Sequence, residues 1–143
     1  MTDLLNQARD ARPLVLAGAL DAGTWTPTVG GSTTNGTITY TTQAGTWKRV
    51  GPLVFASFTI LTSSVSVAPT GNLQVQGLPT AARNSNPNGA VIVTYCNITT
   101  LLRGYVPIGG TACQFADSAG TLILGAVMTG VQNIQGMAVY EVE

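Results

Sequence analysis

The chain has 143 residues, about the size of one domain, with an ordinary hydrophobic content of 45% but only 8% charged residues. Six basic and six acidic side chains cancel to a net charge of zero. The sequence therefore lacks the basic surface that neutralises phosphates, and nucleic acid is not an expected partner. No apolar run approaches the length needed to span a bilayer, which argues against membrane insertion. A neutral, charge-poor surface also lacks self-repulsion, so we expect the chain to work in an assembly.

The first 22 residues are predicted to form an N-terminal arm ahead of a single domain, residues 23–143. Residues 2–12 follow a helical pattern that Pro13 ends, and residues 14–20 form an apolar connector, either a strand or an extended segment. A helix this short is marginal alone in water and needs a surface to pack on. We predict either an arm that anchors the chain to another protein or a cap folded over its own domain. The candidate anchoring residues are Leu4, Leu5, Ala8, Arg9 and Arg12.

From Trp25 onward, short runs rich in Thr and Val alternate with Gly, Pro and Asn, which is typical of β-strands joined by turns. Turns are predicted at residues 35–36, 44–45 and 51–52, and an exposed loop at residues 83–89. The longest run, residues 53–62, places Val54, Ala56, Phe58 and Ile60 on the face that we expect to line the core. The predicted strands are residues 24–29, 37–42, 46–50, 53–62, 73–78, 90–97, 104–108, 112–116, 121–127 and 136–142.

No helical segment between these strands is long enough for a parallel crossover. The predicted fold class is therefore all-β: an antiparallel, jelly-roll-like β-sandwich with a short N-terminal helical or extended arm.

The residues that carry most enzyme chemistry are missing or scattered. There is no histidine, which removes the usual general base and the usual metal ligand. A glycosidase needs two carboxylates across a cleft, and Asp117 is the one acid in the middle of the domain. Neither a calcium loop nor a phosphate-binding loop is present. We expect no enzyme activity, no metal and no cofactor. Cys96 and Cys113 are expected to be buried free thiols, although one disulfide is the alternative.

Aromatic side chains are the remaining candidates for ligand contact, because ring faces stack on sugars and fill protein interfaces. In strands they more often fill the core, which is the interpretation we favour. Lys48 and Arg49 beside Trp47 form either a contact patch or a solvated strand edge, and we favour the edge. The candidate surface or glycan contacts are Trp47, Arg83, Asn84, Asn86 and Asn88.

An ordered series of segments covers residues 23–142: GTWTPT (23–28), GG (30–31), ITYTTQAGTW (38–47), ILTS (60–63), GLP (77–79) and NIQGMAVY (133–140). This series resembles the distal β-domains of bacteriophage tail fibres and related virion surface, or decoration, proteins. The resemblance implies a trimeric β-sandwich that either decorates the particle or recognises the host surface.

Only about twenty residues precede this domain, so we expect a short free-standing unit and not the tip of a long fibre shaft. The favoured hypothesis is a homotrimeric structural protein on the virion surface, assembled in the host cytoplasm. It would act as a capsid decoration or cement protein, or as a short head or tail appendage. Its expected partners are further copies of itself and the major capsid protein or a tail protein. The alternative is a receptor-binding tip for host glycans, and an enzyme acting at a subunit interface is the weakest hypothesis.

Overall fold

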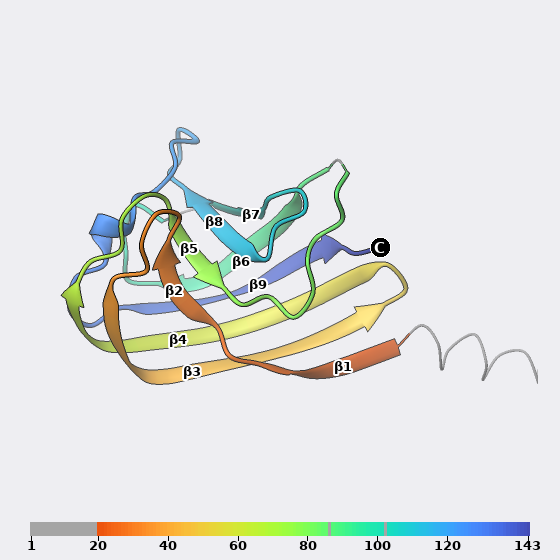
Figure 1. Ribbon diagram of the computed structural model, residues 1–143, viewed down its shortest axis with the longest axis horizontal. Coiled ribbons are helices and arrows are strands. Elements are labelled where there is room, and N and C mark those ends of the chain that lie inside the picture. The colour runs from red at the N-terminus through yellow and green to blue at the C-terminus, as the bar shows by residue number, and fades with distance from the viewer. Residues whose placement is uncertain (1–19, 86, 102) are drawn as a thin grey trace, which may run out of the picture.

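The computed structural model describes residues 20–85, 87–101 and 103–143, which fold into nine strands and one 3₁₀ turn (Figure 1). The predicted helix at residues 2–12, with all five candidate anchoring residues, lies outside the described residues. Within those ranges, no helix is long and apolar enough to cross a membrane. The elements are β1 (Leu20–Trp25), β2 (Thr28–Gly31), β3 (Thr37–Val50), β4 (Leu53–Val67), β5 (Leu73–Gln76), β6 (Gly89–Cys96), β7 (Arg103–Val106), β8 (Ala112–Ala116), η1 (Gly125–Val127) and β9 (Asn133–Glu141).

The strands form one antiparallel sheet in the order β1-β3-β4-β9-β6-β7-β8-β5-β2. Strands β1 and β2 are consecutive in the chain but lie at opposite ends of this order. The sheet therefore curves into two layers, with β1, β3, β4 and β9 in one layer and β2, β5 and β8 in the other (Figure 1). The predicted all-β antiparallel fold is confirmed, and the jelly-roll-like connectivity stays a prediction.

The core lies between the two layers and follows the alternation of the long strands. On β4, the predicted core residues Val54, Ala56, Phe58 and Ile60 are at most 3% exposed. Strand β9 pairs with β4 and alternates between buried and half-buried positions in the same way. The remaining side chains of β4 and β9 consequently point away from the core.

Two predicted elements near the N-terminus differ from the structure. Residues 24–29 are not one strand: β1 ends at Trp25, and β2 begins at Thr28 on the other side of the sandwich. Pro27 between them has no N–H to donate to a sheet, so the chain crosses between layers there. Residues 44–45 are not a turn, because β3 runs through them without interruption.

The predicted strand at residues 121–127 is also wrong. This segment forms isolated bridges and the short η1 turn. Its backbone is still partly paired, since the N–H of Ile123 donates to Phe115 O at 2.9 Å and Ile123 O accepts the N–H of Leu73 at 2.8 Å. The segment thus covers one end of the core without joining the sheet as a strand.

The boundary between arm and domain stays a prediction. Strand β1 begins at Leu20 and so includes residues 20–22 of the predicted arm.

Candidate functional site

A tripeptide repeat, Gly-Thr-Trp at residues 23–25 and again at residues 45–47, forms the junction of β1 and β3. The strands pair so that Gly23 lies opposite Trp47 and Trp25 lies opposite Gly45. Each indole covers the glycine of the other strand. A Cβ on Gly23 would lie 2.8 Å from Trp47 Nε1, and a Cβ on Gly45 would overlap the Trp25 ring. Gly45 is therefore needed for close approach and not for a turn, which explains why β3 is continuous there.

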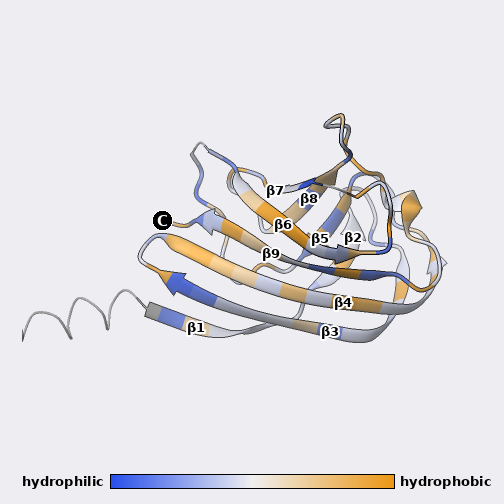
Figure 2. Ribbon diagram, turned by 180° about the vertical axis from the view of Figure 1, so that it is seen from behind, coloured by the Kyte–Doolittle hydropathy of each residue, from blue (hydrophilic) through white to orange (hydrophobic). Residues whose placement is uncertain are grey.

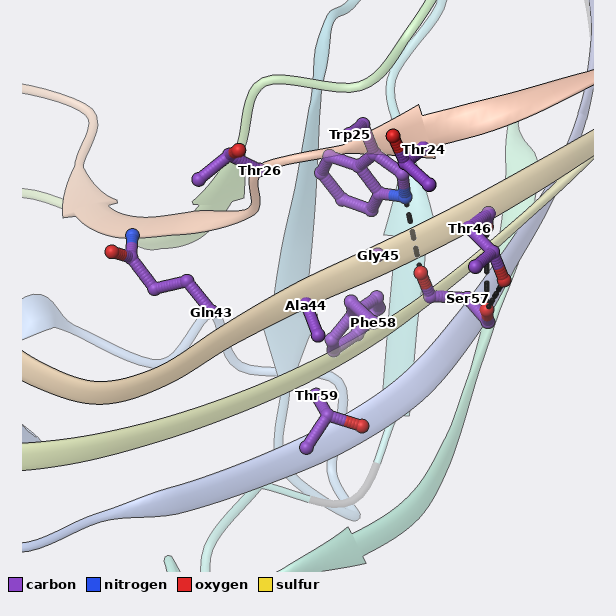
Figure 3. Close-up of a pocket in the computed structure, with 10 residues that line it drawn as sticks. All are labelled: Thr24, Trp25, Thr26, Gln43, Ala44, Gly45, Thr46, Ser57, Phe58 and Thr59. Carbon is purple, nitrogen blue, oxygen red and sulfur yellow. Dashed lines mark hydrogen bonds between the residues drawn. The ribbon is translucent and has the colours of Figure 1, made fainter.

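Trp25 fixes β1 against β4, two strands away. Its Nε1 donates a hydrogen bond of 3.0 Å to the backbone oxygen of Ser57 (Figure 3). Its ring meets Phe58 edge to face, with centroids 6.3 Å apart and an interplanar angle of 79°. Only 9% of Trp25 is exposed, so it acts as a core residue whose single polar atom is satisfied.

A pocket of about 530 Å³ opens beside Trp25, where β1 ends along β3 and β4 (Figure 3). None of the described residues that line it carries a charge. The hydroxyls of Thr46 and Ser57 are already paired at 2.7 Å, and Gln43 Nε2 donates to Pro27 O at 3.0 Å. The pocket is suited to exchanging hydrogen bonds with a neutral polar ligand and offers no charge to bind an ion. It is lined by Thr24, Trp25, Thr26, Gln43, Ala44, Gly45, Thr46, Ser57, Phe58 and Thr59.

Two side chains of β3, Tyr40 and Gln43, close the side of the sandwich between β3 and β2, and we call them the clasp. The Tyr40 hydroxyl accepts the N–H of Val29 at 2.9 Å and donates to Val29 O at 3.2 Å. Gln43 bonds to Pro27 O just before β2. The clasp satisfies backbone groups of Pro27 and Val29 on the side of β2 that faces away from β5, the one strand with which β2 pairs in the described part of the chain. Burial raises the pKa of Tyr40, and the hydrogen bond with Val29 opposes that shift.

The described residues of the predicted loop at 83–89 are largely exposed and meet the β7–β8 connection, although Gly89 already begins β6. The Arg83 guanidinium lies 3.1 Å from a carboxylate oxygen of Glu141, with both side chains about half exposed. Asn88 Oδ1 accepts the N–H of Ile108 at 3.1 Å. Arg83 thus ties its loop to the end of β9, and Asn88 ties the same loop to the β7–β8 connection, at the end of the sheet where the C-terminus lies (Figure 1).

The other predicted contacts do not all join them. Asn84 lies at the same end and lines a separate pocket of about 690 Å³, whereas Asn86 lies outside the described residues. Trp47 faces the core side of β3, where it packs over Gly23 and against the hydrophobic core. A role of these residues in ligand contact stays a prediction.

The described residues contain no group of three or more His, Cys, Asp or Glu side chains that could hold a metal ion. The carboxylate of Asp117 accepts the backbone N–H groups of Ala119 and Thr121, both at 2.9 Å, and so shapes its own loop. Cys96 and Cys113 are free, as predicted, but only Cys113 is buried and Cys96 is half-buried. Burial raises the pKa of Cys113 to about 12. A thiol held neutral in this way is a poor nucleophile.

The pocket beside Trp25 was missed by the sequence analysis. A signal for it was present, because two Gly-Thr-Trp triplets on antiparallel strands can pair so that each ring lies over the opposite glycine. The pattern of small residues at 44–45 predicts a turn instead.

The fold has a counterpart among phage tail proteins. It matches the crystal structure of the Dettilon tailspike protein (gp208) with a TM-score of 0.67 and 19% sequence identity, over 85% of this chain and 24% of that one. This chain thus spans about a quarter of the length of the tailspike. The sequence matches no family model and no curated protein. The resemblance to virion surface β-domains is therefore confirmed at the level of fold.

Proposed function

We propose that the chain is a structural, non-enzymatic protein of a bacteriophage tail that works as an oligomer on the surface of the virion. The observation that carries this proposal is the fold, which covers 85% of the chain and is shared with a tailspike protein. A low charge content and a net charge of zero agree with a surface that is covered in an assembly. The homotrimer that the sequence resemblance implies is the expected state.

The residues around the pockets support a non-enzymatic role. Asp117, the one acid in the middle of the domain, is used by the backbone of its own loop. Glu141 pairs with Arg83 at the end of β9, outside the pocket lining. No two carboxylates face each other across the pocket beside Trp25, whose lining is uncharged.

A tail location replaces the capsid location as the favoured one. The capsid decoration hypothesis came from the expected shortness of the chain, whereas the fold likeness is to a tail protein. Quantitative mass spectrometry of purified particles separates the two locations. We expect far fewer copies of this chain than of the major capsid protein, and a ratio near one to one would favour decoration and contradict a tail location.

Contact with a neutral host glycan is a second candidate function, favoured by the uncharged, hydroxyl-lined pocket beside Trp25 (Figure 3). Sugar hydroxyls exchange hydrogen bonds with such groups without needing charge. The test is calorimetric titration of purified protein with host surface polysaccharide. Thr24→Val and Thr59→Val, which keep side-chain shape, should weaken binding about tenfold or more. Thr39→Val, on the same sheet but outside the pocket, should not. No binding by the wild type would remove this candidate.

A further inference from the structure

The chain contains two Asn-Gly dipeptides, at residues 35–36 and 88–89. Such a dipeptide is chemically labile, because glycine has no Cβ to keep its backbone nitrogen away from the preceding side chain. That nitrogen can attack Cγ, the amide carbon of the asparagine. A cyclic succinimide then forms, ammonia leaves, and water opens the ring to aspartate or isoaspartate. Whether a given dipeptide reacts depends on how the fold holds the two groups.

The nucleophile is free at residues 35–36 and constrained at residues 88–89. The N–H of Gly36 donates no hydrogen bond to the described residues, and both Asn35 and Gly36 are exposed. Gly89, in contrast, begins β6, is half-buried and lies opposite Val106 of β7 in the sheet. Its nitrogen cannot turn toward Asn88 unless this end of β6 separates from β7. The two dipeptides therefore differ in what it costs to reach the reactive geometry.

The amide oxygens of the two asparagines are held in the same way. Gln76 Nε2 donates to Asn35 Oδ1 at 3.0 Å, and the N–H of Ile108 donates to Asn88 Oδ1 at 3.1 Å. Each bond stabilises the negative charge that collects on this oxygen when Cγ is attacked. Neither bond involves Nδ2, the nitrogen that leaves as ammonia. The electrophiles are thus matched, and the difference between the two dipeptides lies in the nucleophile.

The fold also requires glycine at residue 36. Gly36 has a φ of +69°, which residues with a Cβ rarely adopt. A Cβ there would also overlap the backbone oxygen of Val67, the last residue of β4. No side chain can therefore shield the Gly36 nitrogen without disturbing the end of β4. The labile dipeptide is built into the segment that leads into β3.

We propose that Asn35 is a site of spontaneous deamidation in the folded protein, with Gly36 N as the nucleophile and Gln76 Nε2 as the donor to the reacting carbonyl oxygen. The bond between Gly36 N and Asn35 Cγ forms, and the bond between Cγ and Nδ2 breaks with release of ammonia. Water then opens the ring and supplies the oxygen of the new carboxylate. Asn88 is protected by the pairing of Gly89 in the sheet.

The product places a negative charge where the sequence has none. Residues 32–36 and 67–72, which meet through backbone hydrogen bonds, contain no charged side chain. The charged residues Asp21, Lys48 and Arg49 lie at the opposite end of the sandwich, where Figure 2 shows hydrophilic residues on β1 and β3 near the C-terminus. Deamidation therefore lowers the net charge of the chain by one unit from zero and adds that charge to its uncharged end.

Peptide mapping by mass spectrometry tests the proposal on the full chain, incubated at mildly alkaline pH in water enriched in heavy oxygen. Label in the product shows that the reaction took place during the incubation. We expect aspartate and isoaspartate to accumulate at residue 35 about fivefold or more faster than at residue 88, because opening the end of β6 costs at least one backbone hydrogen bond. In urea, where the fold constrains neither dipeptide, the two residues should react at comparable rates.

Equal rates at the two residues of the folded protein, or a faster rate at residue 88, would overturn the proposal. An unmodified residue 35 in folded protein would also overturn it if the same residue reacts in urea.

The role of Gln76 has its own test. Gln76→Met keeps the length of the side chain but removes the N–H, so deamidation at residue 35 should slow by about threefold. Gln74→Met is the matched control, because it removes the other hydrogen-bond partner of Gln76 Nε2 and leaves the bond to Asn35 in place. This control should react like the wild type, and circular dichroism should show that both variants are folded. An unchanged or faster rate in Gln76→Met would overturn the assignment of Gln76 as the donor.

Discussion

At the scale of single residues, the tightest constraint in the molecule is the pair of indole rings packed over glycines. Trp25 is buried and bonded to Ser57 O, so it cannot move away from Gly45 without losing that bond. Trp47 is only half-buried over Gly23 and has more room to shift. The two glycines of the repeat are therefore not equivalent.

We predict that Gly45→Ala lowers the free energy of unfolding by about 1–3 kcal/mol, because the new methyl group overlaps the Trp25 ring. Gly23→Ala is the matched comparison and should cost less, since its Cβ meets the edge of a more mobile ring. Urea unfolding followed by tryptophan fluorescence measures both. An equal or larger effect of Gly23→Ala would show that the Trp25 bond is not the tighter constraint.

Among the described residues, Tyr140 is the largest fully buried side chain, and its hydroxyl makes no hydrogen bond of ordinary geometry to them. Burial raises its pKa from 10.0 to about 12, against a smaller opposing effect of the Thr80 backbone. A buried hydroxyl without a partner costs free energy. We predict that Tyr140→Phe leaves stability unchanged or raises it by about 1 kcal/mol in urea unfolding near neutral pH. A clear loss of stability would mean that the hydroxyl is satisfied.

The raised pKa of Tyr140 predicts that the free energy of unfolding depends on pH. The folded state favours the protonated Tyr140, so this contribution to stability is complete below pH 10 and is lost as the pH rises through about 12. Cys113 acts in the same direction, because its pKa rises from 9.0 to about 12. Wild-type stability should therefore fall from about pH 9 upward, and Tyr140→Phe should make the fall above pH 10 smaller. An unchanged slope in the variant would contradict this assignment.

At the scale of elements, the clasp of Tyr40 and Gln43 joins β3 to the segment around β2, which do not pair with each other in the sheet. The sheet does not close by hydrogen bonding between its terminal strands, and Tyr40 instead serves the N–H and the carbonyl of Val29 together. One hydroxyl therefore satisfies two backbone groups at the edge of β2.

We predict that Tyr40→Phe lowers the free energy of unfolding by about 1–3 kcal/mol, because both Val29 groups lose their partner. The control is Tyr105→Phe, which loses one hydrogen bond of 2.8 Å between side chains, to Gln114, and should cost about 1 kcal/mol or less. Hydrogen exchange of the Val29 amide gives a local measurement. Unchanged protection in Tyr40→Phe would show that the clasp does not hold β2.

The sequence predicted strands best where the alternation of apolar and polar residues, or clear flanking turn residues, define the strand. The alternation on β4 identified its four core residues, and β8 was bounded correctly because glycine and polar residues flank it on both sides. Prediction failed where glycine or proline served the tertiary structure. Gly45 admits a ring from another strand, and Pro27 marks a crossing between layers. Neither role can be distinguished from an ordinary turn without knowing which strands pair.

At the scale of the whole molecule, the sequence indicated an antiparallel all-β fold but not the path of the sheet. The neighbours of β9, which are β4 and β6, come from distant parts of the chain, and local pattern carries no information on such pairings. The pocket beside Trp25 depends on those pairings. The predicted residues Arg83, Asn84 and Asn88 were correctly placed in an exposed loop, whereas Trp47 lies against the core.

The tail location and the oligomeric state meet in one structural prediction. If copies associate through the outward face of β4 and β9, these two long strands are covered within the assembly. The pocket beside Trp25 lies where β1 ends, along the outer edge of β3 (Figure 3). Ser57 of the pocket lining pairs with Met137 on that same face, so such an association would also bring a neighbouring copy close to the pocket.

The most direct measurement is electron cryomicroscopy of intact particles carrying a small fluorescent or gold-binding tag at Glu143, the exposed last residue of the chain. The account predicts tag density on the tail, in symmetry-related copies that contact one another. Density distributed over the capsid shell, or tagged chains that lie apart from each other on the tail, would contradict it.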